Sequence, residues 1–520
     1  MMNSKLSSSV LALSTTAMLM SCGQKPKEQA KTNTKPNVVF IYADDIGFGD
    51  LSCNGAKTIS TPNVEKLANS GVRFTNVHSA AATSTPSRYA MLTGEYAWRK
   101  EGTGIAAGDA GMIIRPHIYT LADMFKRADY QTAAIGKWHL GLGDKTGTQN
   151  WNGHITPGLE DIGFDYSYIM AATGDRVPCV FVENGSVVNL DPNDPISVSY
   201  TDSFPGVPTA KNNPHLLKLH PTQGHDQAII NGIPRIGYMK GGNSALWQDE
   251  NIADSITTKA IQFIEQNQNE PFFLYLATND AHVPRLPHPR FVGKSGLGSR
   301  GDAILEFDWT VGQIMETLKR LGLEENTIVV LSSDNGPIVD DGYADQAIEL
   351  LGDHKPAGPY RGYKYASYEG GTRVPCIVSW KGTIEPKVSN ALLCQIDWIK
   401  SFASAIGANV PEGAAPDSEN RWDSWMGKDL KGRDYLVLQN MDNNLSITDG
   451  SWKYIEPAEG AALNPYTLTE LGNSKDPQLF DLTNDEGETT NCALVEKDKV
   501  EKLHTKLQEI KDNRVGLKQN

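Results

Sequence analysis

Short apolar runs alternate with amphipathic segments along most of the chain. Three runs rich in Val, Ile, Leu and Phe predict buried parallel strands, namely NVVFIYADD, PFFLYLATND and TIVVLSSDNG. Helical patterns lie between them, including TPNVEKLANSG, SITTKAIQFIEQN and DAILEFDWTVGQIMETLKRLG. This alternation predicts an α/β fold with a large, mostly parallel central sheet and helices on both faces. In such sheets, ligands bind at the carboxyl ends of the strands.

Two regions depart from this pattern. Residues 174–250 are rich in Pro, Gly, Asn and His and show no period, so we expect long loops over the binding site. Beyond about residue 410, short strand patterns and a final charged helix predict a smaller α+β domain with an antiparallel sheet. We therefore expect a main domain at 37–410 and a C-terminal subdomain at 411–520.

The N-terminus has the pattern of an export signal. One lysine precedes an apolar run of small residues that ends in LMSC at Cys22, which is typical of a bacterial lipobox. We expect residues 1–22 to be a lipoprotein signal peptide, Cys22 to be lipidated, and polar residues 23–36 to form a flexible tether. The lipid would anchor the protein in the cell envelope, facing the periplasm or the outside. A plain signal peptide with an incidental cysteine is the alternative.

Charge and cysteine content disfavour a nucleic-acid partner and a structural zinc site. The net charge of −14 disfavours nucleic acid as a partner, because nucleic-acid-binding domains are basic. The five other cysteines have no CxxC spacing, which disfavours a structural zinc site. We expect free thiols, although one disulfide is possible in an exported protein.

Acidic residues follow two of the predicted strands. Asp44 and Asp45 end the first strand, and Asp334 and Asn335 end the strand TIVVLSSDNG. If these strands are neighbours, the side chains form an oxygen-rich site suited to Ca²⁺ or Mg²⁺. Taken singly, each pair is more often a turn or a helix cap than a metal ligand, and only the two pairs together make the site a balanced alternative.

Cationic side chains lie near the other predicted strand ends. Lys137 and His139 are two positions apart in IGKWHLG, so on a strand they would face the same side. Around a divalent cation, such groups would form a pocket for a tetrahedral anion. Alone, each would be an ordinary surface lysine or core histidine. The remaining candidates are Arg88, His282 and Lys364.

These motifs together resemble the formylglycine-dependent sulfatases of the alkaline phosphatase superfamily. The family signature is Cys or Ser, any residue, Pro, a small residue and Arg, followed by Leu-Thr-Gly, and STPSRYAMLTG at 84–94 fits throughout. GKWHLG, SDNG, EGGTRVP and QLFDLTNDEGETTN follow in the family's order. The resemblance covers about residues 36–500 and implies an alkaline-phosphatase-like fold.

The resemblance also implies roles for individual residues. Ser84 would be oxidised to formylglycine by a radical-type maturase, and one Ca²⁺ would be held by Asp44, Asp45, Asp334, Asn335 and residue 84. The hydrated aldehyde would attack sulfur with help from Asp334, and Lys137 and Arg88 would bind the sulfate and the formylglycine. His282, with Lys364 nearby, would protonate the leaving alcohol, and His139 would accept the proton when sulfate is expelled.

The substrate lies outside these motifs. A sulfated carbohydrate, such as a glycosaminoglycan or mucin-type glycan, is expected for a lipid-anchored bacterial enzyme of this type. Asp175, Arg176 and His225 are candidate sugar contacts, along with Lys137, His282 and Lys364. The alternatives are a phosphomonoesterase or phosphodiesterase of the same superfamily and an inactive glycan-binding lipoprotein.

Overall fold

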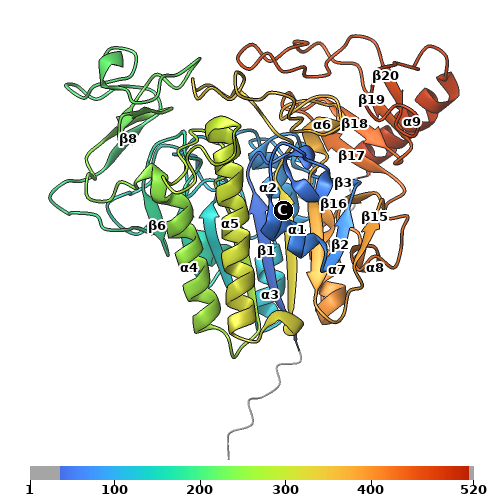
Figure 1. The fold of residues 1–520 in the computed structure, drawn as a ribbon, viewed down its shortest axis with the longest axis horizontal. Helices are drawn as coiled ribbons and strands as arrows, with labels where there is room; N and C mark the ends of the chain where they lie inside the picture. The colour runs from blue at the N-terminus through green and yellow to red at the C-terminus, as the bar shows by residue number, and fades with distance from the viewer. Residues whose placement is uncertain (1–34, 514–520) are drawn as a thin grey trace, which may run out of the picture.

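A ten-stranded mixed sheet forms the centre of the protein (Figure 1). The computed structural model describes residues 35–513. The middle of the sheet is parallel, as predicted, while its two ends contain antiparallel pairs. In spatial order the strands are β15 (Lys387–Ser389), β2 (Gly71–Phe74), β14 (Cys376–Trp380), β13 (Thr327–Ser333), β1 (Asn37–Ala43), β12 (Phe272–Ala277), β4 (Gln131–Lys137), β5 (Tyr166–Met170), β6 (Phe181–Glu183) and β7 (Ser186–Val187).

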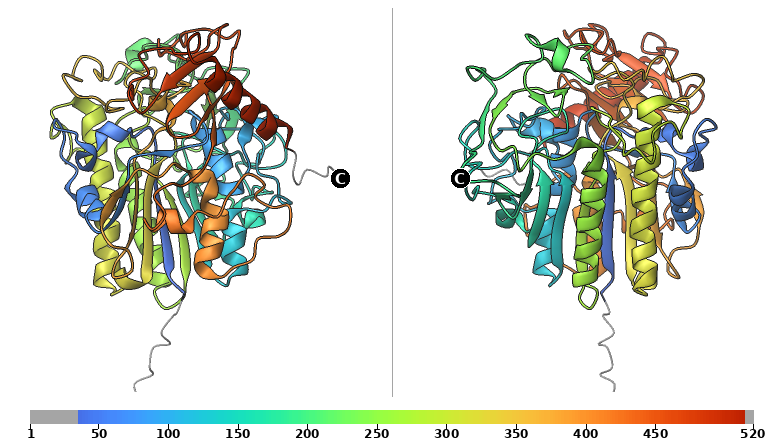
Figure 2. Two further views of the ribbon diagram at one scale, coloured as in Figure 1. Left: turned by 90° about the vertical axis from the view of Figure 1, so that its right-hand side faces the viewer. Right: turned by 60° about the vertical axis from the view of Figure 1, so that its left-hand side comes forward.

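Helices cover both faces of this sheet, which confirms the predicted layers (Figure 2). In one group, α5 (Gly298–Arg320) packs against both α1 (Pro62–Ala68) and α4 (Ile252–Gln266). The second group is α2 (Ser84–Thr93), α3 (Leu121–Arg127), α7 (Trp398–Ile406) and α8 (Trp422–Trp425). Between the layers, β1 is buried along its whole length, as its unbroken apolar run requires.

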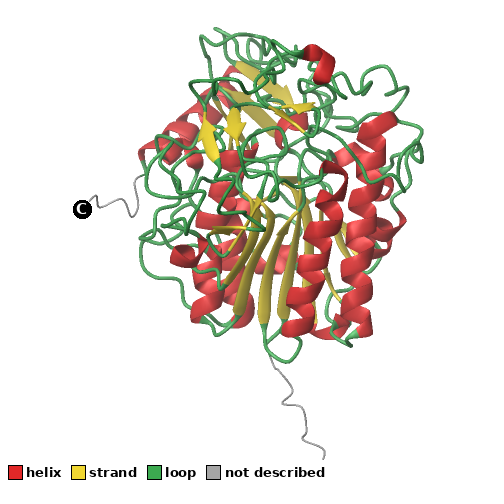
Figure 3. Ribbon diagram, turned by 90° about the vertical axis from the view of Figure 1, so that its left-hand side faces the viewer, coloured by secondary structure: helices red, strands yellow, loops and turns green. Residues whose placement is uncertain are grey.

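The register brings four strand ends to one level. In the parallel core, Ala43 of β1 pairs with Ser333 of β13, and Ala277 of β12 pairs with Gly136 of β4. Because β1 lies between β13 and β12, the residues that follow these strands converge at one edge of the sheet. Figure 3 shows the loops gathered above this edge.

The expectation of long loops at 174–250 is only partly correct. β6 and β7 extend the central sheet, and two further small sheets form from β8 (Ser197–Ser199) with β11 (Tyr238–Lys240) and from β9 (Ile229–Ile230) with β10 (Ile233–Pro234). These strands have two or three residues each, which is too short for a period to appear. Strands β8 and β11 pair across a long loop, as when Tyr238 pairs with Ser199, whereas β9 and β10 are neighbours in the chain.

The antiparallel sheet predicted near the C-terminus is present. It runs in chain order through β17 (Leu436–Gln439), β18 (Leu445–Thr448), β19 (Trp452–Ile455) and β20 (Gln478–Asp481). Helix α9 (Lys497–Asp512) packs on β18 and β19. The remaining elements are β3 (Val77–His78), β16 (Leu393–Cys394) and α6 (Glu369–Thr372).

The C-terminal sheet is hydrogen-bonded to the segment that leads into α2. The amide of Gln439 donates to the carbonyl of Ala80 at 3.1 Å, and the amide of Ala82 donates to the carbonyl of Gln439 at 2.8 Å. The last residue of β17, Gln439, therefore pairs with Ala82, which lies two residues before helix α2 begins at Ser84.

The predicted signal peptide, the Cys22 lipidation site and most of the tether lie outside the described residues. Among residues 35–513, no helix has the length and apolar character needed to cross a bilayer. The five cysteines in this range are free thiols.

Candidate active site

Ser84 begins helix α2, and Arg88 follows one turn later on the same face. Both side chains are buried, with Ser84 3% exposed. The start of a helix carries unpaired amides and a partial positive charge, so it favours an oxyanion at position 84. The spacing of serine and arginine in STPSR is therefore explained by the helical repeat.

Arg88 connects the helix to the end of β13. Its Nε and Nη2 atoms donate to Oδ2 of Asp334 at 3.0 and 2.8 Å, and Nη1 donates to the hydroxyl of Tyr275 at 3.0 Å. Burial would raise the pKa of Asp334, but the charges of Arg88 and Lys137 hold it below its ordinary value. Asp334 is therefore a carboxylate at neutral pH.

Four of the five predicted metal ligands, all except residue 84, meet at the ends of β1 and β13. The side-chain amide of Asn335 donates from Nδ2 to Oδ1 of Asp45 at 2.7 Å, and its Oδ1 accepts a hydrogen bond from the Ser84 hydroxyl at 3.3 Å. The Asp45 amide donates to Asp334 Oδ1 at 3.4 Å. Asp45 has a φ of 58°, a left-handed conformation that aspartate tolerates better than most residues.

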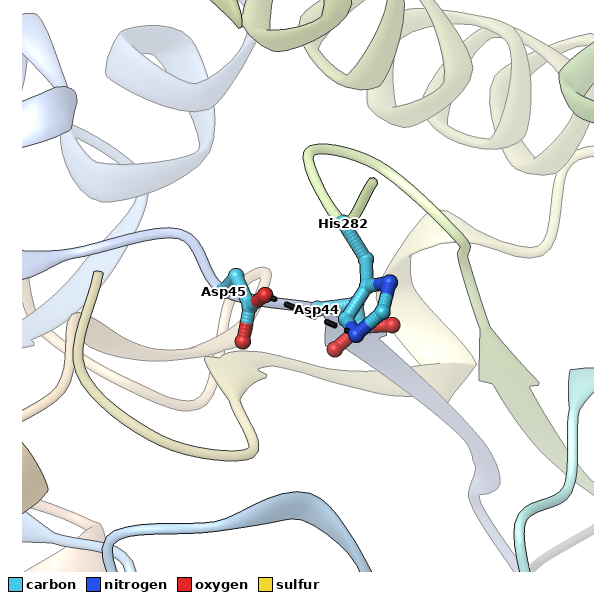
Figure 4. Close-up of side chains that lie close together, drawn as sticks. All are labelled: Asp44, Asp45 and His282. Carbon is cyan, nitrogen blue, oxygen red and sulfur yellow. Dashed lines mark ion pairs between the residues drawn. The ribbon is translucent and has the colours of Figure 1, made fainter. Parts of the chain in front are cut away.

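This arrangement fits a hard divalent cation. Oδ1 of Asp44 is buried and has no hydrogen-bond partner among the described residues. Burial and the neighbouring Asp334 raise the pKa of Asp44 well above its ordinary value, in spite of Lys137. A cation among these oxygens would favour the ionised carboxylates. Asp44 and Asp45 also form a group with His282 that has ligand-type atoms within 4.8 Å of one another (Figure 4).

Lys137, at the end of β4, bridges the acidic group and Ser84. Its Nζ atom donates to Oδ2 of Asp44 at 2.5 Å and to the Ser84 hydroxyl at 3.1 Å. Burial lowers the pKa of Lys137, and the negative charge of Asp44 opposes this effect.

The expectation that Lys137 and His139 share one face of a strand is wrong. Strand β4 ends at Lys137, and His139 has a φ of 58°, so the chain turns between them. His139 nevertheless lines the same pocket as Ser84. Its Nε2 lies 3.0 Å from the carbonyl of Ala106, while its buried Nδ1 has no partner in the described chain. Because a carbonyl only accepts, Nε2 carries the hydrogen and Nδ1 has a free lone pair. Burial and the charge of Lys137 lower the pKa of His139 well below its ordinary value.

His282 and Lys364 approach Asp45 from different loops. His282 Nδ1 lies 2.7 Å from the carbonyl of Val283, so it carries the hydrogen and leaves Nε2 directed at Asp45 Oδ2, 3.8 Å away (Figure 4). Lys364 donates to the same Asp45 oxygen at 2.9 Å and to Asp341 at 3.0 Å. Burial and Lys364 lower the pKa of His282. The pKa of Lys364 is raised, because Asp341 and Asp45 outweigh its burial.

The three predicted sugar contacts form one wall of the same pocket. Asp175 accepts from Nη1 of Arg176 at 2.8 Å and pairs with Nε2 of His225 at 3.0 Å. All three line a cavity of about 480 Å³ that also contains Ser84 and His139. This volume is within the usual range for a small-molecule site.

A sequence profile described as Sulfatase matches residues 36–408. This is more than half of the chain. The protein belongs to the sulfatase family.

Sequence relatives agree with this assignment. This sulfatase is 54% identical over 496 residues to an N-acetylgalactosamine-6-O-sulfatase of Bacteroides thetaiotaomicron, covering 95% of this chain and 97% of the relative. It is 28% identical to human arylsulfatase A, covering 88% and 83% of the two chains. The prediction of a sulfuric ester hydrolase is confirmed.

A solved structure agrees as well. It comes from work on glycosaminoglycan metabolism by Bacteroides thetaiotaomicron and superposes with a TM-score of 0.91 at 55% identity. The match covers 92% of this sulfatase and 99% of the other chain. The predicted fold class is therefore confirmed.

The sulfatase site also contains residues that sequence reasoning missed. Asp341 accepts from Lys364 and from the Tyr365 hydroxyl at 2.8 Å, so it positions the lysine. An acidic pair soon after SDNG was the available signal. Met441, Asn464, Tyr466 and Thr467 line the pocket from the C-terminal sheet region, and their positions along the chain give no sign of this.

Proposed function

We propose that this sulfatase removes a 6-O-sulfate from N-acetylgalactosamine units of a glycosaminoglycan or mucin-type glycan. The observation that carries the proposal is the 54% identity, across nearly the whole of both chains, to a protein with that named activity. The pocket supports it, because polar and charged groups converge on one wall of a small cavity.

We also propose that Ser84 is converted to formylglycine by a radical-type maturase and that one Ca²⁺ binds Asp44, Asp45, Asp334, Asn335 and residue 84. The unpartnered Oδ1 of Asp44 supports the metal. When present, the formylglycine hydrate supplies the nucleophile and Ca²⁺ neutralises charge on the sulfate group.

The surrounding side chains hold residue 84 in a fixed position. Lys137 donates to its oxygen, and Arg88 holds Asp334 beside it. The Ser84 hydroxyl is close enough to Asp334 to contribute to the low pKa of this carboxylate. Arg88 donates twice to Oδ2 of Asp334, whereas Oδ1 accepts a long hydrogen bond of 3.4 Å from the Asp45 amide, so Oδ1 would receive the proton of the attacking hydroxyl.

Two histidines are assigned opposite proton transfers. The free Nδ1 lone pair of His139 makes it the base that accepts a proton when sulfate is expelled. His282 presents Nε2 toward Asp45, where a bound sulfate ester would favour the charged form of the imidazole. It protonates the leaving alcohol, with Lys364 beside it as a permanent positive charge.

Asp175, Arg176 and His225 contact the sugar ring in this proposal. The Asp175 carboxylate is already paired with Arg176 and His225, so the three side chains present a fixed set of donors and acceptors. Such a set distinguishes hydroxyl orientations, because a mismatched sugar leaves buried polar groups unpaired.

A lipid anchor on Cys22 would place the enzyme in the cell envelope, in reach of extracellular glycans. Metabolic labelling with a palmitate analogue tests this point, because a Cys22→Ala variant should lose both the label and membrane association.

The substrate proposal is tested by incubating the matured enzyme with three monosaccharides and measuring released sulfate. These are N-acetylgalactosamine 6-sulfate, N-acetylgalactosamine 4-sulfate and N-acetylglucosamine 6-sulfate. We expect the first to be hydrolysed at least about tenfold faster than the others, the discrimination available to a site that hydrogen-bonds a hydroxyl. Preference for either of the others would contradict the proposal.

A further inference from the structure

A turn of the C-terminal subdomain closes one side of the pocket mouth. Asn464, Tyr466 and Thr467 line the cavity from this turn, and Met441 lies beside them. The turn sits between β19 and β20, far along the chain from all the catalytic motifs.

Hydrogen bonds hold the turn in one shape. Oδ1 of buried Asn464 accepts from the amides of Tyr466 at 2.8 Å and Thr467 at 3.3 Å. The backbone amide of Asn464 donates to the carbonyl of Thr469 at 2.8 Å, and the backbone amide of Leu468 donates to the carbonyl of Asn464 at 3.0 Å. A side chain carried by such a turn is positioned before a ligand arrives, which lowers the entropic cost of binding.

Tyr466 is the exposed aromatic side chain of this turn. It is 67% exposed, and it makes no side-chain hydrogen bond, ring stacking or cation–π contact within residues 35–513. Ile105, another residue of the pocket lining, is also exposed at 42%. An aromatic ring held open on a rigid turn is typical of a binding surface.

Burial orders the pocket from floor to mouth. Ser84 and Asp175 are each 3% exposed, whereas Tyr466 and Ile105 are the open apolar groups. A sulfate group that reaches Ser84 therefore places its own sugar ring against the buried polar wall. Whatever is attached to that ring must extend toward Tyr466.

We propose that Tyr466, with Met441 and Ile105, forms an outer subsite for a second sugar ring linked to the sulfated one. The ring would stack its apolar face on Tyr466, and the Thr467 hydroxyl, which already donates to Thr469 at 2.9 Å, would accept a hydrogen bond from the edge of the ring. This proposal rests on the proposed function, and it assigns the C-terminal subdomain a direct part in recognising an oligosaccharide.

The test compares N-acetylgalactosamine 6-sulfate with two disaccharides that carry a second ring on O1 or on O3 of that sugar. Released sulfate gives kcat/KM for the matured wild type, Tyr466→Ala, Tyr466→Phe and Leu468→Ala. Leu468 belongs to the same turn and is 71% exposed, but it does not line the pocket. Thermal melting checks that each variant is folded.

We expect Tyr466→Ala to lose about fivefold to tenfold more kcat/KM on at least one disaccharide than on the monosaccharide. Tyr466→Phe should retain the stacking ring and most of this preference, and Leu468→Ala should match the wild type. Equal losses on all three substrates, or no loss, would overturn the outer subsite. If the wild type releases no sulfate from any of them, the proposed substrate is wrong instead.

Discussion

Arg88 and Asp334 form a fully buried ion pair in which two guanidinium nitrogens donate to one carboxylate oxygen. The pair joins α2, one turn after its start, to the residue that follows β13. It therefore sets the distance between residue 84, one turn before Arg88, and the oxygen cluster at the sheet edge. Breaking one partner of a buried pair costs about 3–5 kcal/mol, so this contact is structural as well as functional.

Replacing Ser84 with Ala should abolish sulfate release without unfolding the protein. The variant loses the oxygen that Lys137 and Asn335 contact, and no formylglycine can form. We expect a loss of about a thousandfold or more in kcat with a melting temperature close to the wild type. Ser451→Ala, at an exposed turn, is the matched control. Retained turnover in Ser84→Ala would rule out the assigned nucleophile.

Removing the metal should lower activity reversibly. Three carboxylates converge at the ends of β1 and β13, and Asp44 Oδ1 is left without a partner. We expect EDTA to inactivate the enzyme, Ca²⁺ to restore it, and Asp44→Asn to reduce both bound metal and activity by about a hundredfold. Elemental analysis of the purified protein measures the metal directly. Asp353→Asn, at an exposed loop, should keep both, and indifference to chelation with no bound metal would contradict the site.

His282→Ala should harm alkyl sulfates more than activated aryl sulfates. A poor leaving group needs a proton in the transition state, whereas a phenolate with electron-withdrawing groups does not. We expect a loss of about a hundredfold or more on an alkyl sulfate and less than about tenfold on a nitrophenyl sulfate. His288→Ala, in the same loop, provides the comparison. Equal losses on both substrates would assign the acid role elsewhere.

Deprotonation of Glu488 should lower the free energy of unfolding as pH rises. Its carboxylate accepts from the Glu369 amide at 2.6 Å and faces Lys453 and Glu369 inside the contact between the C-terminal sheet and α6. Burial raises its pKa to about 7, from an ordinary value of 4.5, although Lys453 opposes the shift. Between these values the folded protein holds a proton that the unfolded chain has released, so folding is favoured below this window and weakened above it.

We therefore expect the midpoint of urea unfolding to decrease between pH 5 and pH 7.5, and Glu488→Gln to flatten this decrease. Glu369 has a pKa held low by Lys453 and Arg373 in spite of burial, so it stays ionised throughout and adds no slope. Glu486→Gln, two residues away and exposed, should keep the wild-type slope. The same slope in all three proteins would show that Glu488 does not titrate in this window.

Local signals in the sequence were sufficient to predict the fold class and the acidic residues at two strand ends. Apolar runs marked β1, β12 and β13, and the acids directly after β1 and β13 identified the ends of those two strands. The STPSR spacing was explained only by the structure, in which helix α2 begins at Ser84 and places Arg88 one turn later on the same face. The alternation expected of a strand predicted the wrong side-chain direction for His139, because the backbone turns within two residues of Lys137.

Contacts between distant segments were decided only by the tertiary structure. The strand order β13–β1–β12–β4 places Lys137 beside Asp44. Asp341 contacts Lys364 because the two loops that carry them fold over the same sheet edge. Strands β8 and β11 pair across a long loop, and the turn that carries Tyr466 reaches the pocket from a segment far along the chain from Ser84. Neighbouring residues cannot encode such contacts, because they depend on burial and register across the whole sheet.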